Sequence, residues 1–137
     1  GTMVRTGEGA GIAVVIMNNQ TVDIFNPKTI RATMGSIFRV PIVYVPDLAP
    51  VLEQMHAKGI YTYAAHLKGQ EYYDSFSFRE PTAFLIGNEG NGLSKEISDQ
   101  AGQYLKIPME GRVESLNASI AAALLMYEAH RQRSARL

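Results

Sequence analysis

Short apolar runs alternate with longer amphipathic stretches along this chain, and that alternation constrains its fold more than any other feature. The runs are apolar throughout, as expected of strands that are buried on both faces of a sheet. Strands that alternate with helices are typical of βα units. We therefore predict an α/β fold, a mostly parallel sheet flanked by helices, with strands over Ile12–Met17, Pro41–Val45, Ile60–His66, Ala83–Ile86 and Tyr104–Ile107.

Capping residues and glycines place the helices between these strands. Asn26-Pro27 is typical of an N-cap followed by proline at the first helical position, which predicts a helix to about Met34. Gly35 follows where a C-terminal glycine is expected. A second helix is predicted over Asp47–Lys58, and a short one from Ser94 to Gln100.

The clearest helical pattern begins at Leu116 and ends in the polar stretch at residues 130–133. Ser115 is the natural candidate for its N-cap. In contrast, Lys68–Pro81 is polar, aromatic and turn-rich, so we expect a loop there, one able to move.

Composition narrows the class of protein. With 137 residues, 46% of them hydrophobic and 19% charged, the chain has the size and composition of one globular domain. The absence of cysteine excludes disulfides and thiolate metal sites, and the three histidines show no ligand spacing, so no metal is expected. Without a membrane-spanning run or a signal peptide, we expect a cytoplasmic protein with no membrane partner.

The charge balance bears on nucleic-acid binding. Lys plus Arg number 13 and Asp plus Glu number 13, so no global positive field attracts RNA or DNA. A local arginine cluster could still bind a phosphate backbone. Arg31 and Arg39 are candidates for such contacts, and Arg112 lies in a second, glycine-bearing loop.

A glycine-rich loop follows the predicted strand at Ala83–Ile86. Its glycines, Gly87, Gly90 and Gly92, allow a backbone to approach a ligand closely. In open α/β sheets, ligands bind at the carboxyl ends of strands. The spacing matches neither the dinucleotide fingerprint nor a phosphate-binding loop. Glu89 either acts on a ligand or ties down neighbouring amides.

The second candidate segment runs from Ile107 to Asn117. A strand ends at Pro108, and a glycine-bearing loop then leads into the long helix. The N-terminus of that helix offers free amides and the positive end of a dipole. Asn117 in the first turn either takes part in chemistry or satisfies local backbone groups.

Four motifs in order resemble one enzyme family across essentially the whole chain. They read G-T-M-V-R-T at residues 1–6, N-P-K-T-I-R-A-T-M-G-S at 26–36, L-I-G-N-E-G-N-G-L at 85–93, and I-P-M-E-G-R-V-E-S-L-N-A-S-I-A-A-A at 107–123. Together they resemble the SpoU (TrmH-like) branch of the SPOUT methyltransferases. The resemblance implies a C-terminal trefoil knot, S-adenosylmethionine as methyl donor and ribose 2′-hydroxyls of ribosomal or transfer RNA as acceptors. It also implies a homodimer formed through the C-terminal helix.

Functional residues follow from the matching motif positions. The resemblance assigns the catalytic positions to Arg5, Glu89, Ser115 and Asn117. It assigns cofactor binding to Ala64, Ala65, Gly87, Asn88, Gly90, Ile107, Met109 and Leu116. A guanidinium keeps its proton at neutral pH, so we expect Arg5 to position phosphate and hydroxyl rather than act as a free base.

We interpret residues 1–137 as a SpoU-type catalytic domain. The family's first strand and the asparagine that opens its first motif are expected before Gly1, as is an upstream RNA-binding domain. Three alternatives stay open. They are a non-catalytic RNA- or nucleotide-binding module on the same scaffold, a SPOUT enzyme that methylates a base nitrogen, and an unknotted flavodoxin-like nucleotide binder.

Overall fold

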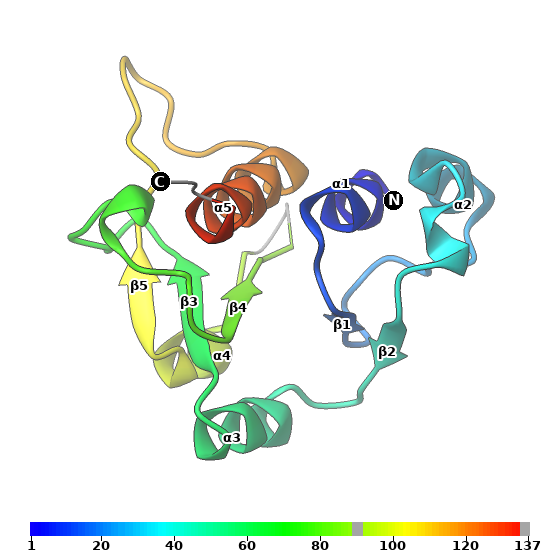
Figure 1. Ribbon diagram of the computed structural model, residues 1–137, viewed down its shortest axis with the longest axis horizontal. Coiled ribbons are helices and arrows are strands. Elements are labelled where there is room, and N and C mark those ends of the chain that lie inside the picture. Colours follow the sequence, from blue (N-terminus) through cyan, green and yellow to red (C-terminus); the bar gives the residue numbers. More distant parts are fainter. Residues whose placement is uncertain (89–91, 135–137) are drawn as a thin grey trace. The chain divides into compact units, whose positions relative to one another are not determined.

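The computed structural model describes residues 1–88 and 92–134. It divides into two compact units, residues 1–47 and 48–137, each described here by itself (Figure 1). The predicted α/β fold with parallel strands flanked by helices is confirmed. The C-terminal trefoil knot stays a prediction.

The first unit is built on two parallel strands. Its elements are α1 (Thr2–Ala10), β1 (Val15–Met17), α2 (Pro27–Thr33), the 3-10 helix η1 (Ser36–Phe38) and β2 (Ile42–Tyr44). Met17 lies opposite Tyr44 in the β1–β2 ladder. Met17 is also part of the unit's core, which contains Val4, Ile24 and Val40.

The second unit contains a three-stranded parallel sheet in the order β4-β3-β5. Its elements are α3 (Ala49–Ala57), β3 (Tyr61–Ala65), η2 (Tyr73–Ser75), β4 (Thr82–Leu85), α4 (Lys95–Gln100), β5 (Gln103–Leu105) and α5 (Ala118–Arg133). The central strand β3 pairs with both neighbours, so its side chains are the most enclosed of the sheet.

Opposite faces of this sheet carry separate hydrophobic cores. Successive side chains of a strand point to opposite faces. Tyr63 of β3 packs with Phe78 and with Leu125 of α5, whereas the adjacent Ala64 packs with residues of α3 and α4. Helix α5 thus packs on one face of the sheet, and α3 and α4 pack on the other.

Local chemistry explains most element boundaries. Asn26 caps α2 as predicted, because its side chain accepts a hydrogen bond from the Lys28 amide at 2.9 Å. The helix ends with Met34 and Gly35 both at positive φ, 50° and 90°. Ser94 caps α4, as predicted. The N-terminal helix ends at Gly11, whose φ is 81°.

The prediction for the start of the long helix was wrong. The N-cap of α5 is Asn117 and not Ser115, because the Asn117 side chain accepts a hydrogen bond from the Ser119 amide at 2.9 Å. An amide oxygen at Asn117 reaches the first-turn amide, so the helix begins two residues later than its apolar periodicity indicates. Ser115 lies exposed before it.

Lys68–Pro81 contains no strand, as predicted for a loop. The loop is nevertheless held by hydrogen bonds to other parts of the second unit. The Lys106 amide donates to the Glu71 carbonyl at 3.0 Å, and the Tyr73 amide donates to the Lys106 carbonyl at 2.9 Å. Further along, the loop is bound by side chains of α5. Over the described residues, no helix is both long and apolar enough to cross a bilayer.

Candidate active site

The three parallel strands of the second unit end at the same edge of their sheet. Ala64 and Ala65 form the end of β3, Gly87 lies two residues after β4, and Ile107 lies two residues after β5. The structure therefore brings four of the predicted cofactor-binding residues to one edge. This is the edge at which open α/β sheets bind ligands.

Position 87 requires glycine because the chain at Gly92 and Leu93 passes directly against it. A Cβ built at Gly87 would lie 2.5 Å from both the Gly92 carbonyl carbon and the Leu93 nitrogen. The Gly92 amide donates to the Asn88 carbonyl at 2.7 Å, and Gly92 has a φ of 65°. Gly87 and Asn88 thus lie against Gly92 and Leu93, whereas the sequence suggested that Gly87 allows close approach to a ligand. The predicted residues Glu89 and Gly90 lie outside the described residues.

The segment that follows β5 has unused backbone groups. In the described part of the chain, residues 107–116 make no backbone hydrogen bonds. Ile107, Met109 and Leu116 are half-buried there, while Ser115 is exposed. Free amides and carbonyls beside apolar side chains are the features that a nucleoside-sized ligand needs.

Asn117 joins this segment to α5. Its Oδ1 accepts hydrogen bonds from the Ser119 amide at 2.9 Å and the Ser119 hydroxyl at 2.6 Å. The oxygen is therefore engaged in capping, and the Nδ2 amino group is the donor that Asn117 can offer to another molecule. Leu116 is half-buried immediately before the cap.

Arg5 lies on α1 in the first unit, while the other predicted site residues belong to the second. Its side chain is exposed, and among the described residues it has no hydrogen-bond or ion-pair partner. A free guanidinium suits an anionic substrate such as a phosphate group. The structure therefore leaves Arg5 available for the predicted positioning role.

Arg39, a candidate phosphate contact from the sequence, forms an ion pair with Glu8 inside the first unit. Its Nε donates to Glu8 Oε2 at 2.5 Å and its Nη2 donates to Glu8 Oε1 at 2.8 Å. The Ser36 hydroxyl adds a third hydrogen bond to Glu8 at 2.7 Å. The hydrogen bonds from Arg39 and Ser36 lower the pKa of Glu8 to about 2. Arg31 on α2 is exposed, as a phosphate contact requires.

The sequence did not predict a set of hydrogen bonds, here called the clasp, between the end of α5 and the loop before β4. Gln132 Oε1 accepts from the Phe78 amide at 2.6 Å, and Gln132 Nε2 donates to the Phe76 carbonyl at 2.9 Å. Arg133 donates to the Phe78 and Glu80 carbonyls. The partners are more than 50 residues apart, and no sequence periodicity links them. The clasp fixes the chain just before β4, and so anchors the strand that leads to Gly87.

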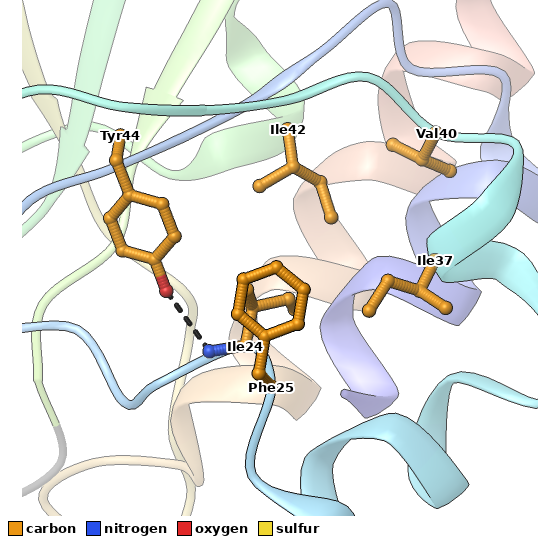
Figure 2. Close-up of a pocket in the computed structure, with 6 residues that line it drawn as sticks. All are labelled: Ile24, Phe25, Ile37, Val40, Ile42 and Tyr44. Atoms are coloured by element: carbon orange, nitrogen blue, oxygen red, sulfur yellow. Dashed lines mark hydrogen bonds between the residues drawn. The ribbon is translucent and has the colours of Figure 1, made fainter.

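Two pockets lie elsewhere in the units. Figure 2 shows the first, about 250 Å³ and lined by Ile24, Phe25, Ile37, Val40, Ile42 and Tyr44. The Tyr44 hydroxyl accepts from the Ile24 amide at 3.0 Å, and no lining residue is charged. The second pocket, about 280 Å³, is polar and lies beside β5, lined by residues including Lys68, Gln103 and Tyr104.

His66 lies one residue beyond the end of β3, so the predicted strand was one residue too long there, and its side chain has local partners. Its Nδ1 accepts a hydrogen bond from the Lys68 amide at 3.0 Å, and its ring stacks on Tyr104 with centroids 4.5 Å apart. These contacts give the His66 ring a structural role, so no role as a general base is needed to explain its position.

Known proteins resemble this chain in sequence and fold. The family model described as the SpoU rRNA Methylase family matches residues 1–127. The 23S rRNA (guanosine(2553)-2′-O)-methyltransferase RlmP of Bacillus subtilis (strain 168) is 35% identical over 127 residues, covering 93% of this chain and 51% of RlmP. The chain thus spans about half the length of such relatives.

Solved structures agree with the sequence relatives. The SpoU methyltransferase AviRb of Streptomyces viridochromogenes, in complex with the cofactor AdoMet, superposes with a TM-score of 0.90 at 34% identity, covering 98% of this chain and 53% of AviRb. A structure that concerns the 2-OH methylation of C/U34 on tRNA superposes with a TM-score of 0.87 at 30% identity, covering 98% of this chain and 88% of its own. Since the family model covers most of the sequence, the chain belongs to the SpoU rRNA methylase family.

Proposed function

We propose that this chain transfers a methyl group from S-adenosylmethionine to a ribose 2′-hydroxyl of ribosomal or transfer RNA. The observation that carries the proposal is the shared edge of β3, β4 and β5, where Ala65, Gly87 and Ile107 converge in a member of this family. Relatives support both halves of the reaction. AviRb binds AdoMet, and RlmP is named as a guanosine 2′-O-methyltransferase.

The residues at the sheet edge fit the proposed cofactor. Ile107, Met109 and Leu116 offer half-buried apolar surface suited to an adenine ring and a thioether chain, whereas the fully buried Ala64 side chain packs in the core and holds the end of β3 in place. Backbone groups of residues 107–116, which have no partner among the described residues, can hydrogen-bond the polar edge of the nucleoside. When bound, S-adenosylmethionine supplies an electrophilic methyl group. Ala65, Gly87, Asn88 and Gly90 complete the proposed binding set.

The protein's own part in the reaction is mainly positioning. Methyl transfer needs the attacking oxygen and the methyl carbon within about 3–3.5 Å and in line. We assign the Arg5 guanidinium to the RNA phosphate and the 2′-hydroxyl, since it is exposed and unpaired in the described structure. The Asn117 Nδ2 group, Ser115 and Glu89 are the further polar groups assigned to the site. Arg31 is proposed as an additional phosphate contact.

We propose that the chain is the catalytic domain of a longer cytoplasmic protein with an upstream RNA-binding domain. The curated relatives are about twice as long as the matched segment. Among the described strands, β1 pairs with β2 alone and β4 pairs with β3 alone, so each has an edge that can accept another strand. A strand preceding Gly1 would supply such a partner.

A homodimer through α5 is also proposed. Ile120, Leu124 and Tyr127 are 53%, 37% and 46% exposed and lie along one side of the helix, at spacings of four and three residues. Another copy of α5 would cover this apolar stripe. Leu124→Glu should convert a dimer to monomers in light scattering, whereas the exposed Ser134→Glu should not. A Leu124→Glu protein that stays dimeric would disprove this interface.

Methyl transfer from labelled S-adenosylmethionine tests the proposed activity directly. Full-length protein is incubated with unmodified 23S rRNA transcript or with a tRNA pool, and the RNA is digested to nucleosides. A labelled 2′-O-methyl nucleoside is expected, and its identity shows whether guanosine is the acceptor. Label on a base nitrogen, or cofactor binding without any transfer, would refute ribose methylation.

A further inference from the structure

Arg5 and Glu8 are three residues apart on α1, close enough to form an ion pair on the helix surface. Glu8 is the single carboxylate of this helix. In an isolated helix of this sequence, the nearest anion available to the Arg5 guanidinium would therefore be Glu8. The folded unit does not contain that pair.

The Glu8 carboxylate is instead turned toward η1 and the residue after it. Arg39 binds both of its oxygens, and the buried Ser36 hydroxyl adds another hydrogen bond to Oε1. A fork of two N–H groups on a carboxylate is a strong and geometrically specific arrangement. The Arg39 and Glu8 side chains are 58% and 33% exposed, so the specificity of this pair comes from its forked geometry and not from burial.

We propose that Arg39 is a positioning residue for Arg5: by holding Glu8, it prevents that carboxylate from capturing the Arg5 guanidinium, which stays free for the RNA phosphate. The proposal rests on the function proposed above for Arg5. It also gives Arg39 a role within the fold, since its Nε and Nη2 groups donate hydrogen bonds to Glu8.

The size of the effect follows from helix-surface ion pairs. Pairs at this spacing shift an equilibrium by about 1.5- to 2.5-fold. Arg39→Gln should therefore raise the KM for RNA by about 1.5- to 2.5-fold while kcat changes little, because bound RNA displaces Glu8 from Arg5. A purely structural role would instead lower the melting temperature, weaken S-adenosylhomocysteine binding and reduce kcat.

A double-mutant cycle in the full-length protein tests the proposal. Glu8→Gln alone should leave the KM for 23S rRNA transcript at or below the starting value, since it removes the competitor. Glu8→Gln combined with Arg39→Gln should restore the KM that Arg39→Gln raised. A double variant as impaired as Arg39→Gln would overturn the proposal, because direct RNA contact by Arg39 or a structural role predicts that result.

A second readout does not depend on turnover. With ¹⁵N-labelled arginine, the Arg5 Nε–H signal should shift in Arg39→Gln and return to its original position in the double variant. If no RNA is methylated, the proposed function fails, yet this signal still decides whether Glu8 captures Arg5. Should Arg39→Gln not fold, Arg39→Lys replaces it. Lys offers one contact in place of the fork, so an intermediate KM supports the proposal and an unchanged Arg5 signal contradicts it.

Discussion

Gln132→Ala should loosen the chain that leads into β4. The Gln132 side chain accepts from the Phe78 amide at 2.6 Å and donates to the Phe76 carbonyl at 2.9 Å. The Phe78 residue is fully buried, so its amide loses its partner without full access to water. Unsatisfied buried groups of this kind cost about 1–3 kcal/mol each. We expect a loss of about 2–3 kcal/mol, since the site is partly open to solvent.

Hydrogen exchange of the Phe78 amide measures this loss locally, so it needs no assumption that the whole protein unfolds in one step. A loss of about 2–3 kcal/mol corresponds to exchange faster by roughly 30- to 150-fold. The matched control is Ser134→Ala, at the same end of α5, whose side chain makes no described hydrogen bond. Its effect should stay within about 0.5 kcal/mol. Equal exchange at Phe78 in the two variants would show that the clasp does not hold the loop.

Further predictions concern Glu8, Gly87 and Asn117. The pKa of Glu8 is lowered from 4.5 to about 2 in the folded protein, so its ion pair stabilises the fold above pH 4.5, and that contribution disappears as the pH falls toward 2. Urea unfolding should therefore show the starting protein more stable than Glu8→Gln at pH 6, with the gap closing at pH 2.5; a constant gap would contradict the pairing. Gly87→Ala should destabilise the second unit by about 1–3 kcal/mol and weaken S-adenosylhomocysteine binding in calorimetry, because the added Cβ would lie 2.5 Å from the returning chain. Asn117→Asp should keep the N-cap and the stability of α5 but lose methyl transfer, whereas Asn117→Ala should also lose about 1 kcal/mol of stability; an active Asn117→Asp enzyme would remove the Nδ2 group from the proposed site.

The predicted order of strands and helices was correct because it rests on local signals. Apolar runs, Asn26-Pro27 and Ser94 act within a few residues, and the structure places an element at each. The strand boundaries were less accurate. The run from Ile12 is apolar, yet the Ile12 amide donates to the Gly7 carbonyl at 3.0 Å and so ends α1 instead of starting β1. Periodicity does not reveal which backbone partner a boundary residue takes.

The candidate site residues were predicted from motif positions. The structure adds how these residues are arranged in space and which distant residues hold them. Parallel pairing explains why Ala65, Gly87 and Ile107, from strands separated in sequence, meet at one edge. By contrast, the anchored loop before β4 depends on Gln132 and Arg133 at the far end of α5. Such contacts depend on which side chains the completed fold brings together, so no window of sequence contains them.

Under the proposed function, the pairing of arginine side chains within the fold determines which guanidinium groups are free to bind RNA phosphates. The chain has no net charge, so any attraction to RNA must come from individual cationic side chains. A guanidinium that is paired within the fold is less available to a phosphate. Arg39 and Arg131 are paired with Glu8 and Glu128, and Arg133 donates to backbone carbonyls. Of the two candidates Arg5 and Arg39 from the sequence, the described structure leaves the Arg5 side chain without a partner and pairs Arg39 with Glu8. Neutralising Arg5 should therefore reduce the salt dependence of RNA binding by about one phosphate contact. Neutralising Arg39 together with Glu8 should leave that slope unchanged, and a reduced slope would mean that Arg39 contacts the RNA itself.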